Sequence, residues 1–463
     1  MLIQSGKEAL RLNIDAYLKG LKGKKVLVLG LGVSNRPLVR LLLQHGIDVC
    51  GCDRTPREKL DEEILQLESM GAELHLGDDY LRNIEGDVAF RTPGLHPQTP
   101  ELVQLRAKGT RVTSEMEAFF EVCPCPIIGV TGSDGKTTTT TLIAELLRRA
   151  GRRVWVGGNI GTPLLDKAEE IRPTDHVVLE LSSFQLMDLH QSCHIAVVTN
   201  LAPNHLDMHR DMQEYVEAKK NIFLRQSASD TLIINMDNAI TESFAAESKG
   251  HVRRFSRLSV PADGVYLKDG VILRNGEAIL RQSDILLPGI HNVENYMAAI
   301  LATDGLVSTD DVRYVASHFG GVEHRIELVR VKDGVSFYND SIASSPSRTI
   351  AGLRSFQQKV ILIAGGYDKH IPYDVLGPEI TEHVKLLICT GATGEKIAQA
   401  TLRAEGTPPE ILRIDDFYEA IRTAAARACA GDVVLLSPAS AAFDKFKNFM
   451  VRGAEFKKTV MEL

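Results

Sequence analysis

A glycine-rich stretch near residue 130 carries the residue types that bind nucleotide phosphates. Residues 129–138 read GVTGSDGKTT and lie between an apolar run, PIIGV, and a helix-like sequence, TTTLIAELLRRAG. Small residues let backbone N–H groups face phosphate oxygens, and the helix N-terminus adds partial positive charge. Lys136 would reach the terminal phosphates and Thr137 could bind Mg²⁺, although Val130 stands where the common pattern has its first glycine. We interpret this stretch as a phosphate-binding loop; the alternative is a glycine turn with an exposed lysine.

Two further polar segments follow apolar runs. Glu180 ends the run HVVLE, and His205-x-Asp207-x-His209 comes after HIAVVTN. Ligands of open α/β sheets bind beyond the carboxyl ends of strands, and Mg²⁺ prefers oxygen ligands, so Glu180 is a candidate Mg²⁺ ligand. The histidine spacing also suggests zinc, but Pro203 indicates a turn, and we favour His205 as a single ligand near a second Mg²⁺. The alternatives are a helix-capping role for Glu180 and a surface histidine.

A second glycine motif lies near the start of the chain. Gly30-x-Gly32-x-x-Asn35 follows the apolar run KKVLVL, and Asp53 ends the next such run. This arrangement is similar to a dinucleotide fingerprint, with Asn35 in place of the third glycine. Three interpretations stay open: a tight turn without a cofactor, a redox dinucleotide site, and a site for a uridine nucleotide at the same edge.

Short apolar runs alternate with helical patterns along the whole chain, which predicts an α/β fold with parallel sheets. At roughly 150 residues per domain, 463 residues predict about three domains. The Cys-Pro dipeptides at 123–126 and the start of EHR at 323 indicate the boundaries. We therefore expect a Rossmann-like domain over 1–121, a central P-loop ATPase-like domain over 122–322 and a Rossmann-like domain over 323–463. The Gly-punctuated tract DGVYLKDGVILRNGEAIL predicts antiparallel hairpins within the central domain.

Composition narrows the function class. The chain has 53 Lys and Arg against 60 Asp and Glu, a net charge of −7, which disfavours a nucleic-acid partner. Its seven cysteines are scattered without a C-x-x-C pair, which disfavours a cysteine metal site. We find neither a signal-peptide pattern nor an apolar run of about 18 residues, the length that spans a membrane. We expect a cytoplasmic, monomeric enzyme without membrane insertion.

Nine motifs in one order resemble the Mur ligase family, ATP-dependent enzymes that build the peptidoglycan stem peptide. They are TGSDGKTT, GGNIG, ELSSFQL, NHLD, HNVENYMAA, EHRIE, NDSIASS, GGYDK and LLSPASAAFDKFKNF. ELSSFQL, the Asn-Asp-Ser tract and the closing motif look most like the members that add D-glutamate. The resemblance implies that ATP phosphorylates the carboxylate of UDP-N-acetylmuramoyl-L-alanine and that the amine of D-glutamate attacks the acyl phosphate, in cytoplasmic peptidoglycan precursor synthesis.

The resemblance also implies roles for individual residues. Catalytic roles would belong to Lys136, His205 and Lys219, the last as a carbamate. Mg²⁺ ions, two in number, would be held by Thr137, Glu180, His205 and Lys219. ATP would contact Gly132, Ser133, Asp134, Gly135, Lys136, Thr137, Thr138, Thr139, Asn292, Asn295, Arg325 and Asp340. The UDP-substrate would contact Gly30, Gly32, Asp53, Arg54, Thr92, Pro93, Gly94, Asn159 and Ser182. D-glutamate would contact Ser344, Lys369, Phe443 and Phe449.

Two positions depart from the family pattern in the motifs that the resemblance assigns to D-glutamate binding. Ile342 stands where lysine is common, and Ala442 where a serine often contacts the side-chain carboxylate of D-glutamate. Three other functions compete with D-glutamate addition: an amide ligase for another amino acid, such as another Mur member or a folylpolyglutamate synthetase; an NAD-dependent oxidoreductase built on Gly30 and Gly32; and a nucleotide-binding regulator without catalysis.

Overall fold

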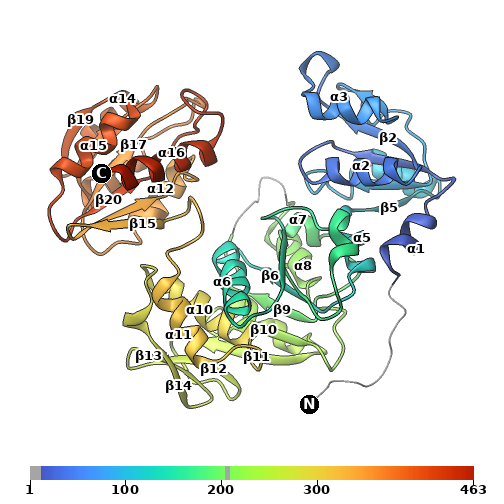
Figure 1. Ribbon diagram of the computed structural model, residues 1–463, viewed down its shortest axis with the longest axis horizontal. Helices are drawn as coiled ribbons and strands as arrows, with labels where there is room; N and C mark the ends of the chain where they lie inside the picture. Colours follow the sequence, from blue (N-terminus) through green and yellow to red (C-terminus); the bar gives the residue numbers. More distant parts are fainter. Residues whose placement is uncertain (1–11, 204–208) are drawn as a thin grey trace. The chain divides into compact units, whose positions relative to one another are not determined.

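The computed structural model describes residues 12–203 and 209–463, and the chain divides into two compact units. The first unit comprises residues up to 282 together with 294–315, and the second comprises 283–293 together with 316–463. Each unit is built from sheets covered by helices, so the predicted α/β fold is confirmed (Figure 1). The boundaries at 121 and 322 stay predictions.

The N-terminal part of the first unit is a parallel sheet with the strand order β3-β2-β1-β4-β5. Its strands are β1 (Lys25–Leu29), β2 (Asp48–Asp53), β3 (Glu73–Leu76), β4 (Val88–Arg91) and β5 (Arg111–Thr113). Its helices are α1 (Ile14–Lys19), α2 (Asn35–Gln44), α3 (Glu62–Ser69), α4 (Pro100–Ala107) and α5 (Glu115–Val122). The strand order reverses between β1 and β4, which is where open α/β sheets bind ligands.

The central sheet has the order β14-β13-β12-β11-β10-β9-β6-β8-β7. Strands β6 to β12 pair in parallel, whereas β12, β13 and β14 are antiparallel, which confirms the predicted hairpins. The strands are β6 (Ile127–Thr131), β7 (Val154–Gly158), β8 (His176–Glu180), β9 (Ile195–Val198), β10 (Thr231–Asn235), β11 (His251–Ser256), β12 (Gly264–Lys268), β13 (Val271–Arg274) and β14 (Glu277–Arg281). The helices are α6 (Lys136–Arg149), α7 (Ser183–Leu186), α8 (Met212–Lys220), α9 (Ala239–Ser243), α10 (Ile290–Ala302) and α11 (Thr309–His318).

The two sheets of the first unit share one hydrophobic core. Val26 and Val28 of β1, Phe119 of α5 and Leu179 of β8 belong to the same buried cluster. Helix α5 is buried almost all round, as expected for a helix that is covered on more than one side. Strands β4 and β8 both contribute residues to this shared core, so they belong to one packed unit.

The second unit has the sheet order β15-β16-β20-β17-β18-β19, with β15 antiparallel to β16. Its strands are β15 (Glu327–Lys332), β16 (Val335–Asn339), β17 (Val360–Ala364), β18 (Val384–Cys389), β19 (Glu410–Arg413) and β20 (Val433–Leu436). Its helices are α12 (Pro346–Leu353), α13 (Leu376–His383), α14 (Gly394–Arg403), α15 (Phe417–Arg427) and α16 (Phe449–Glu462). Separate clusters bury α12, α13 and α14 in one core and α15 and α16 in another.

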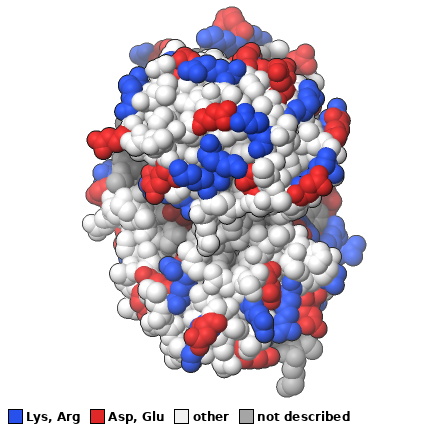
Figure 2. All heavy atoms as spheres, turned by 90° about the vertical axis from the view of Figure 1, so that its left-hand side faces the viewer, with Lys and Arg blue, Asp and Glu red and all other residues white. Residues whose placement is uncertain are grey.

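Charged side chains are interspersed on the face drawn in Figure 2, where basic and acidic groups alternate. The exposed ion pairs of the second unit include Arg413 with Glu395 at 2.7 Å and Arg427 with Glu410 at 2.5 Å. Among the described helices, none combines the length and apolarity that a membrane span needs.

Candidate nucleotide and substrate site

The phosphate loop joins the end of β6 to the start of α6, in the strand–loop–helix context that the sequence predicts. Gly132 and Gly135 have φ angles of 149° and 77°, which favour glycine. A Cβ atom on Gly132 would overlap Oγ1 of Thr199, and one on Gly135 would overlap Oδ1 of Asn295. Both glycines are therefore required by their neighbours as well as by the turn.

The segment after β9 holds the loop in place. The Ser133 hydroxyl accepts from the Ala202 N–H at 2.9 Å, donates to the Ala202 carbonyl at 2.8 Å and lies 3.0 Å from the Tyr215 hydroxyl. Thr199 Oγ1 donates to the Asp134 carbonyl at 2.6 Å. With the Ser133 side chain used in this way, a phosphate would meet the backbone of the loop.

Two lysines converge on one carbonyl of the loop. Lys136 Nζ donates to the carbonyl of Gly132 at 3.0 Å, and Lys219 Nζ, from α8, donates to the same oxygen at 2.9 Å. Lys219 is 1% exposed, and it also donates to Thr131 Oγ1 at 3.1 Å. Burial and the neighbouring Lys136 charge lower the pKa of Lys219 well below its usual value, against the opposing effect of Glu180. The Lys219 amine is thereby shifted toward its neutral form.

A buried carboxylate lies at the end of β8. Glu180 Oε1 accepts from Asn159 Nδ2 at 2.7 Å, while Oε2 is buried and has no hydrogen-bond partner in residues 12–203 and 209–463. A buried carboxylate oxygen left in this way fits a hard cation such as Mg²⁺. Thr137, the other predicted ligand of the first ion, is buried in the first turn of α6. His205, predicted for the second ion, lies outside the described residues.

The turn after β7 packs directly against Glu180. Asn159 N–H donates to the Glu180 carbonyl at 2.8 Å, and a Cβ on Gly158 (φ 92°) would overlap that carbonyl. Beyond Glu180, Ser182 caps α7 through a capping box with Gln185. Asn159 and Ser182, two predicted substrate contacts, therefore flank the candidate metal ligand.

The first glycine motif lies at the carboxyl edge of the N-terminal sheet. The Asp53 carboxylate accepts from the N–H groups of Leu31 at 2.7 Å and Thr55 at 2.8 Å, which fixes the loop after β1. Asn35 Nδ2 donates to the Gly30 carbonyl at 2.8 Å, so this side chain closes the turn. A Cβ on Gly30 would overlap the Thr92 side chain. Gly30, Asp53 and Thr92 are brought together as predicted, whereas Arg54 is exposed and lies 3.6 Å from Asp78.

In the second unit, Asp340 lies where β16 and β20 end. Its carboxylate accepts from the Ile326 N–H at 3.3 Å and from the Ser437 hydroxyl at 2.8 Å. Burial raises the pKa of Asp340 to about 7, although these hydrogen bonds oppose the shift. His324 and Ile326 have φ angles of 64° and 44°, so half-buried Arg325 sits between two residues in the left-handed region.

The predicted D-glutamate residues lie on loops of the second unit and at the start of α16, and one buried arginine ties two of these loops together. Arg452 donates to the Ser341 hydroxyl and carbonyl at 3.0 and 2.9 Å and to the carbonyls of Ser440 and Ala441 at 3.0 Å. Ser341 Oγ donates to the Phe449 carbonyl at 2.8 Å. The 341–344, 440–443 and 449 segments are thereby joined.

A further loop, 365–369, joins this group through the Tyr367 N–H, which donates to the Ala441 carbonyl at 2.9 Å. Tyr367 and Phe443 are exposed and pack edge to face, with ring centroids 5.8 Å apart. Lys369 is exposed two residues further on. Tyr367 thus links the loop that carries Lys369 to Phe443 and to the 440–443 segment.

Two family models match the chain: the Mur ligase middle domain over residues 130–303 and the Mur ligase glutamate ligase domain over 324–440. A UDP-N-acetylmuramoylalanine--D-glutamate ligase of Acetivibrio thermocellus is 54% identical over 458 residues, covering 96% of this chain and 98% of the relative. The chain belongs to the Mur ligase family. A ligase of the same name from Ruminiclostridium cellulolyticum is 49% identical to this Mur ligase, over 97% of the chain and 99% of the relative.

A solved structure gives the same fold at lower identity. The crystal structure of a UDP-N-acetylmuramate-alanine ligase from Thermotoga maritima superposes on this Mur ligase with a TM-score of 0.59 at 17% identity, covering 95% of this chain and 99% of that one. The predicted family is therefore confirmed by sequence and its fold by structure.

The predicted ATP contacts Asn292 and Asn295 lie in the first half of α10. Asn295 is held in the first unit, where its Oδ1 accepts from Thr139 at 3.1 Å, while Asn292 donates to the Pro288 carbonyl at 2.6 Å. Sequence reasoning missed Arg452 and Tyr215. A signal for Arg452 exists, since an arginine within NFMVRGAEF sits on the same helix face as Gly453, Phe456, Thr459 and Val460, none of which is charged.

Proposed function

We propose that this Mur ligase forms the amide bond between UDP-N-acetylmuramoyl-L-alanine and D-glutamate at the expense of ATP, in cytoplasmic peptidoglycan precursor synthesis. The identity of 54% with a D-glutamate ligase over nearly the whole chain carries this proposal. The phosphate loop, the two lysines beside it and the buried Glu180 carboxylate support it. Residues 1–121 would receive the UDP end, 122–322 the ATP and 323–463 the amino acid.

The loop amides and Lys136 hold the ATP phosphates in this proposal. Lys136 would exchange its present carbonyl partners for phosphate oxygens, which are stronger acceptors for a cation. Thr137 and Glu180 would hold one Mg²⁺, and His205 and Lys219 a second. Bound Mg²⁺ neutralises charge on the transferring phosphoryl group. Asn295, Asn292, Arg325 and Asp340 would contact the nucleoside.

Lys219 serves as a metal ligand only after its charge is changed. The amine would add to the carbon of CO₂ and release one proton, giving a carbamate whose oxygens can bind a cation. Near-complete burial and the hydrogen bond to the Gly132 carbonyl hold Nζ at the loop, beside Lys136. An anion beside Lys136 also removes the repulsion between two cations.

The reaction needs alignment rather than a nucleophile from the protein. The muramoyl-alanine carboxylate would attack the γ-phosphorus, and the D-glutamate nitrogen would then attack the acyl phosphate and expel phosphate. Holding the two reactants in line supplies much of the acceleration of such a step. Asn159 and Ser182 would orient the carboxylate. Lys369 and Ser344, with Phe443 and Phe449, would orient D-glutamate. Ile342 in place of lysine removes one cation there, and Ala442 in place of serine removes one hydroxyl donor, so the proposal relies on the charge of Lys369.

An isotope transfer experiment tests this chemistry. UDP-N-acetylmuramoyl-L-alanine labelled with oxygen-18 in its carboxylate is incubated with ATP, Mg²⁺ and D-glutamate, and the phosphate released is analysed by mass spectrometry. An acyl phosphate predicts one labelled oxygen in each phosphate. Unlabelled phosphate would exclude the acyl phosphate. ATP binding without amine-dependent phosphate release would favour a nucleotide-binding regulator without catalysis, and nicotinamide-dependent turnover would favour an oxidoreductase.

A further inference from the structure

Arg91, the last residue of β4, is a buried cation whose donors are all engaged. Its side chain is 1% exposed. Nε donates to Oδ2 of Asp188 at 2.8 Å, and one terminal nitrogen donates to Oδ1 of the same carboxylate and to the Phe184 carbonyl at 3.0 Å. The other terminal nitrogen donates to the carbonyls of Thr92 at 3.3 Å and Leu95 at 3.1 Å. These five bonds match the five N–H donors of a guanidinium.

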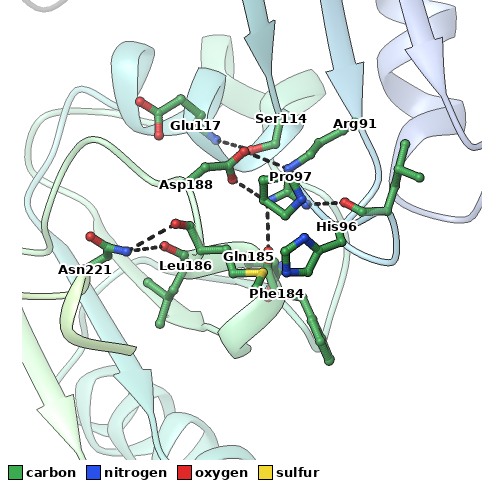
Figure 3. Close-up of polar contacts among 12 residues, drawn as sticks. Arg91, His96, Pro97, Ser114, Glu117, Phe184, Gln185, Leu186, Asp188 and Asn221 are labelled. Carbon is green, nitrogen blue, oxygen red and sulfur yellow. Dashed lines mark hydrogen bonds and ion pairs between the residues drawn. The ribbon is translucent and has the colours of Figure 1, made fainter. Parts of the chain in front are cut away.

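Figure 3 shows the arginine reaching from the strand end to Asp188 and the α7 segment. Two of its bonds close the loop that follows β4, and three fix that loop to the central part of the unit. The planar fork of arginine matches a carboxylate bidentately, which lysine cannot do. The side chain therefore ties two chain segments together in one defined geometry.

The two segments carry different parts of the proposed substrate site. Thr92, Pro93 and Gly94, proposed for the UDP end, follow Arg91 directly, whereas Phe184 and Asp188 follow Ser182, proposed for the muramoyl end. A cavity between the segments is lined by Asn35, Arg91, Pro93, Gly158, Phe184 and Gln185, among others. Arg91 therefore lines this cavity together with Pro93, one of the residues proposed to contact the UDP end.

Helix α5 adds two more polar contacts across the same boundary. The buried Glu115 carboxylate accepts from the Leu165 N–H at 3.1 Å, and Glu117 accepts from the His190 N–H at 2.9 Å. Arg91 and Glu115 themselves line the cavity, so two of the residues that make these contacts are also part of its wall. Such a boundary resists sliding, because each displaced group would lose its partner in a water-poor setting.

We propose that Arg91 is a positioning residue that holds the uridine end and the muramoyl end of the nucleotide sugar at a fixed separation. The inference rests on the proposed function, because it takes the nucleotide sugar as the substrate. A ligand whose two ends bind preset sites gains affinity from their connection. If the 92–95 loop is loosened, the whole nucleotide sugar loses this gain in affinity. A ligand that carries only one of the two ends should still bind nearly as tightly as before.

The test compares the whole substrate with its uridine end in Arg91→Lys, Asp188→Asn and the control Arg106→Met. Arg106 reaches the same carboxylate at 3.8 Å from a partly exposed position. For each chain, KM for UDP-N-acetylmuramoyl-L-alanine, KM for ATP, kcat and the inhibition constant of UDP are measured. Arg91→Lys is expected to raise KM for the nucleotide sugar about tenfold. The UDP inhibition constant and KM for ATP should stay within about twofold of the wild-type values.

Asp188→Asn keeps the side-chain shape and one hydrogen-bond acceptor, and it should raise KM for the nucleotide sugar by about threefold. This variant tests the proposal even if Arg91→Lys folds poorly. Arg106→Met should stay within about twofold on every constant. A lower kcat with an unchanged ratio of KM to the UDP inhibition constant would mean a smaller active fraction and would overturn the positioning role. An active wild type with unchanged constants in both variants would also overturn it. A wild type that never uses the nucleotide sugar would overturn the proposed function, and this inference with it.

Discussion

Asn159 donates a hydrogen bond of 2.7 Å to Oε1 of Glu180, and its backbone N–H donates to the Glu180 carbonyl at 2.8 Å. Asn159 therefore holds both the carboxylate and the main chain of Glu180, and it leaves the other carboxylate oxygen, Oε2, without a bond to this amide. Hydrogen-bond donors that contact a metal ligand in this way orient metal-binding carboxylates. The GGNIG turn thus supports the candidate Mg²⁺ ligand, and it also carries Asn159, which is proposed to contact the substrate.

Glu180→Gln should raise the Mg²⁺ concentration needed for half-maximal phosphate release by at least about tenfold. The substitution keeps the side-chain shape but replaces a charged oxygen by an amide. A Mg²⁺ titration of activity measures the shift, and Glu217→Gln, an exposed glutamate on α8 that pairs with Lys220, is the control. Equal Mg²⁺ requirements in Glu180→Gln and wild type would remove Glu180 from the metal site.

Lys136→Ala should lower kcat about a thousandfold or more while the fold is retained, because a single cation is lost at the transferring phosphoryl group. Steady-state phosphate release gives kcat, and circular dichroism reports the fold. Arg148→Ala changes a cation on the exposed side of the same helix and should leave kcat unchanged. Near-normal turnover in Lys136→Ala would contradict the assignment of the phosphate loop.

Lys219→Ala should be inactive, and added bicarbonate should not restore it, because no amine remains to take up CO₂. Short carboxylic acids should restore part of the activity by supplying the missing oxygen ligand. Activity is measured with each additive over a concentration series, with Lys220→Ala as a neighbouring lysine control. Full activity of Lys219→Ala without additive would take Lys219 out of the site.

Gly135→Ala should raise KM for ATP and weaken ATP binding, since a Cβ there meets Asn295 and strains a backbone with φ of 77°. Gly151→Ala is a close control: its φ is 75°, but nothing lies within 4 Å of the added Cβ. Strain alone costs on the order of 1–2 kcal/mol of stability, so both variants should lose stability. Only Gly135→Ala should lose ATP affinity, and an equal ATP affinity in both variants would contradict the packing argument.

Asp340 makes stability depend on pH. Its pKa rises from 3.8 to about 7 on folding, so the folded state holds the proton more tightly and stability falls as pH rises between these values. Above about pH 7 the full cost applies, at most about 4 kcal/mol. Asp340→Asn should therefore gain free energy of unfolding relative to wild type, more at pH 8 than at pH 5, while losing ATP affinity. Urea unfolding at both pH values measures this, and a difference independent of pH would contradict the buried-carboxyl account.

The sequence predicts those parts of the molecule that depend on local pattern. The phosphate loop, the strand ends at Glu180 and Asp53, and the hairpins after residue 264 all follow from short stretches in which residue type and spacing predict the local structure. The order of the motifs then indicates the family. These features lie close in the chain to the elements that carry them.

Contacts between distant segments were not predictable. Arg91 sits in a tract assigned to the UDP end, yet its guanidinium is used on Asp188, 97 residues away. Arg452 reaches Ser341, 111 residues away, and Asn295 reaches Thr139, 156 residues away. Such pairs depend on how the sheets and helices pack, which cannot be inferred from the local patterns of a single sequence.

The most direct test of the central claim is the amino-acid selectivity of the ligase. The wild-type chain is incubated with ATP, Mg²⁺, UDP-N-acetylmuramoyl-L-alanine and, in separate reactions, D-glutamate, L-glutamate, L-serine, diaminopimelate or L-lysine, and both phosphate and the mass of the nucleotide product are measured. We predict phosphate release and a product heavier by one glutamate residue with D-glutamate alone, despite Ile342 and Ala442. A product with another amino acid, or phosphate release that ignores the amine, would contradict the account.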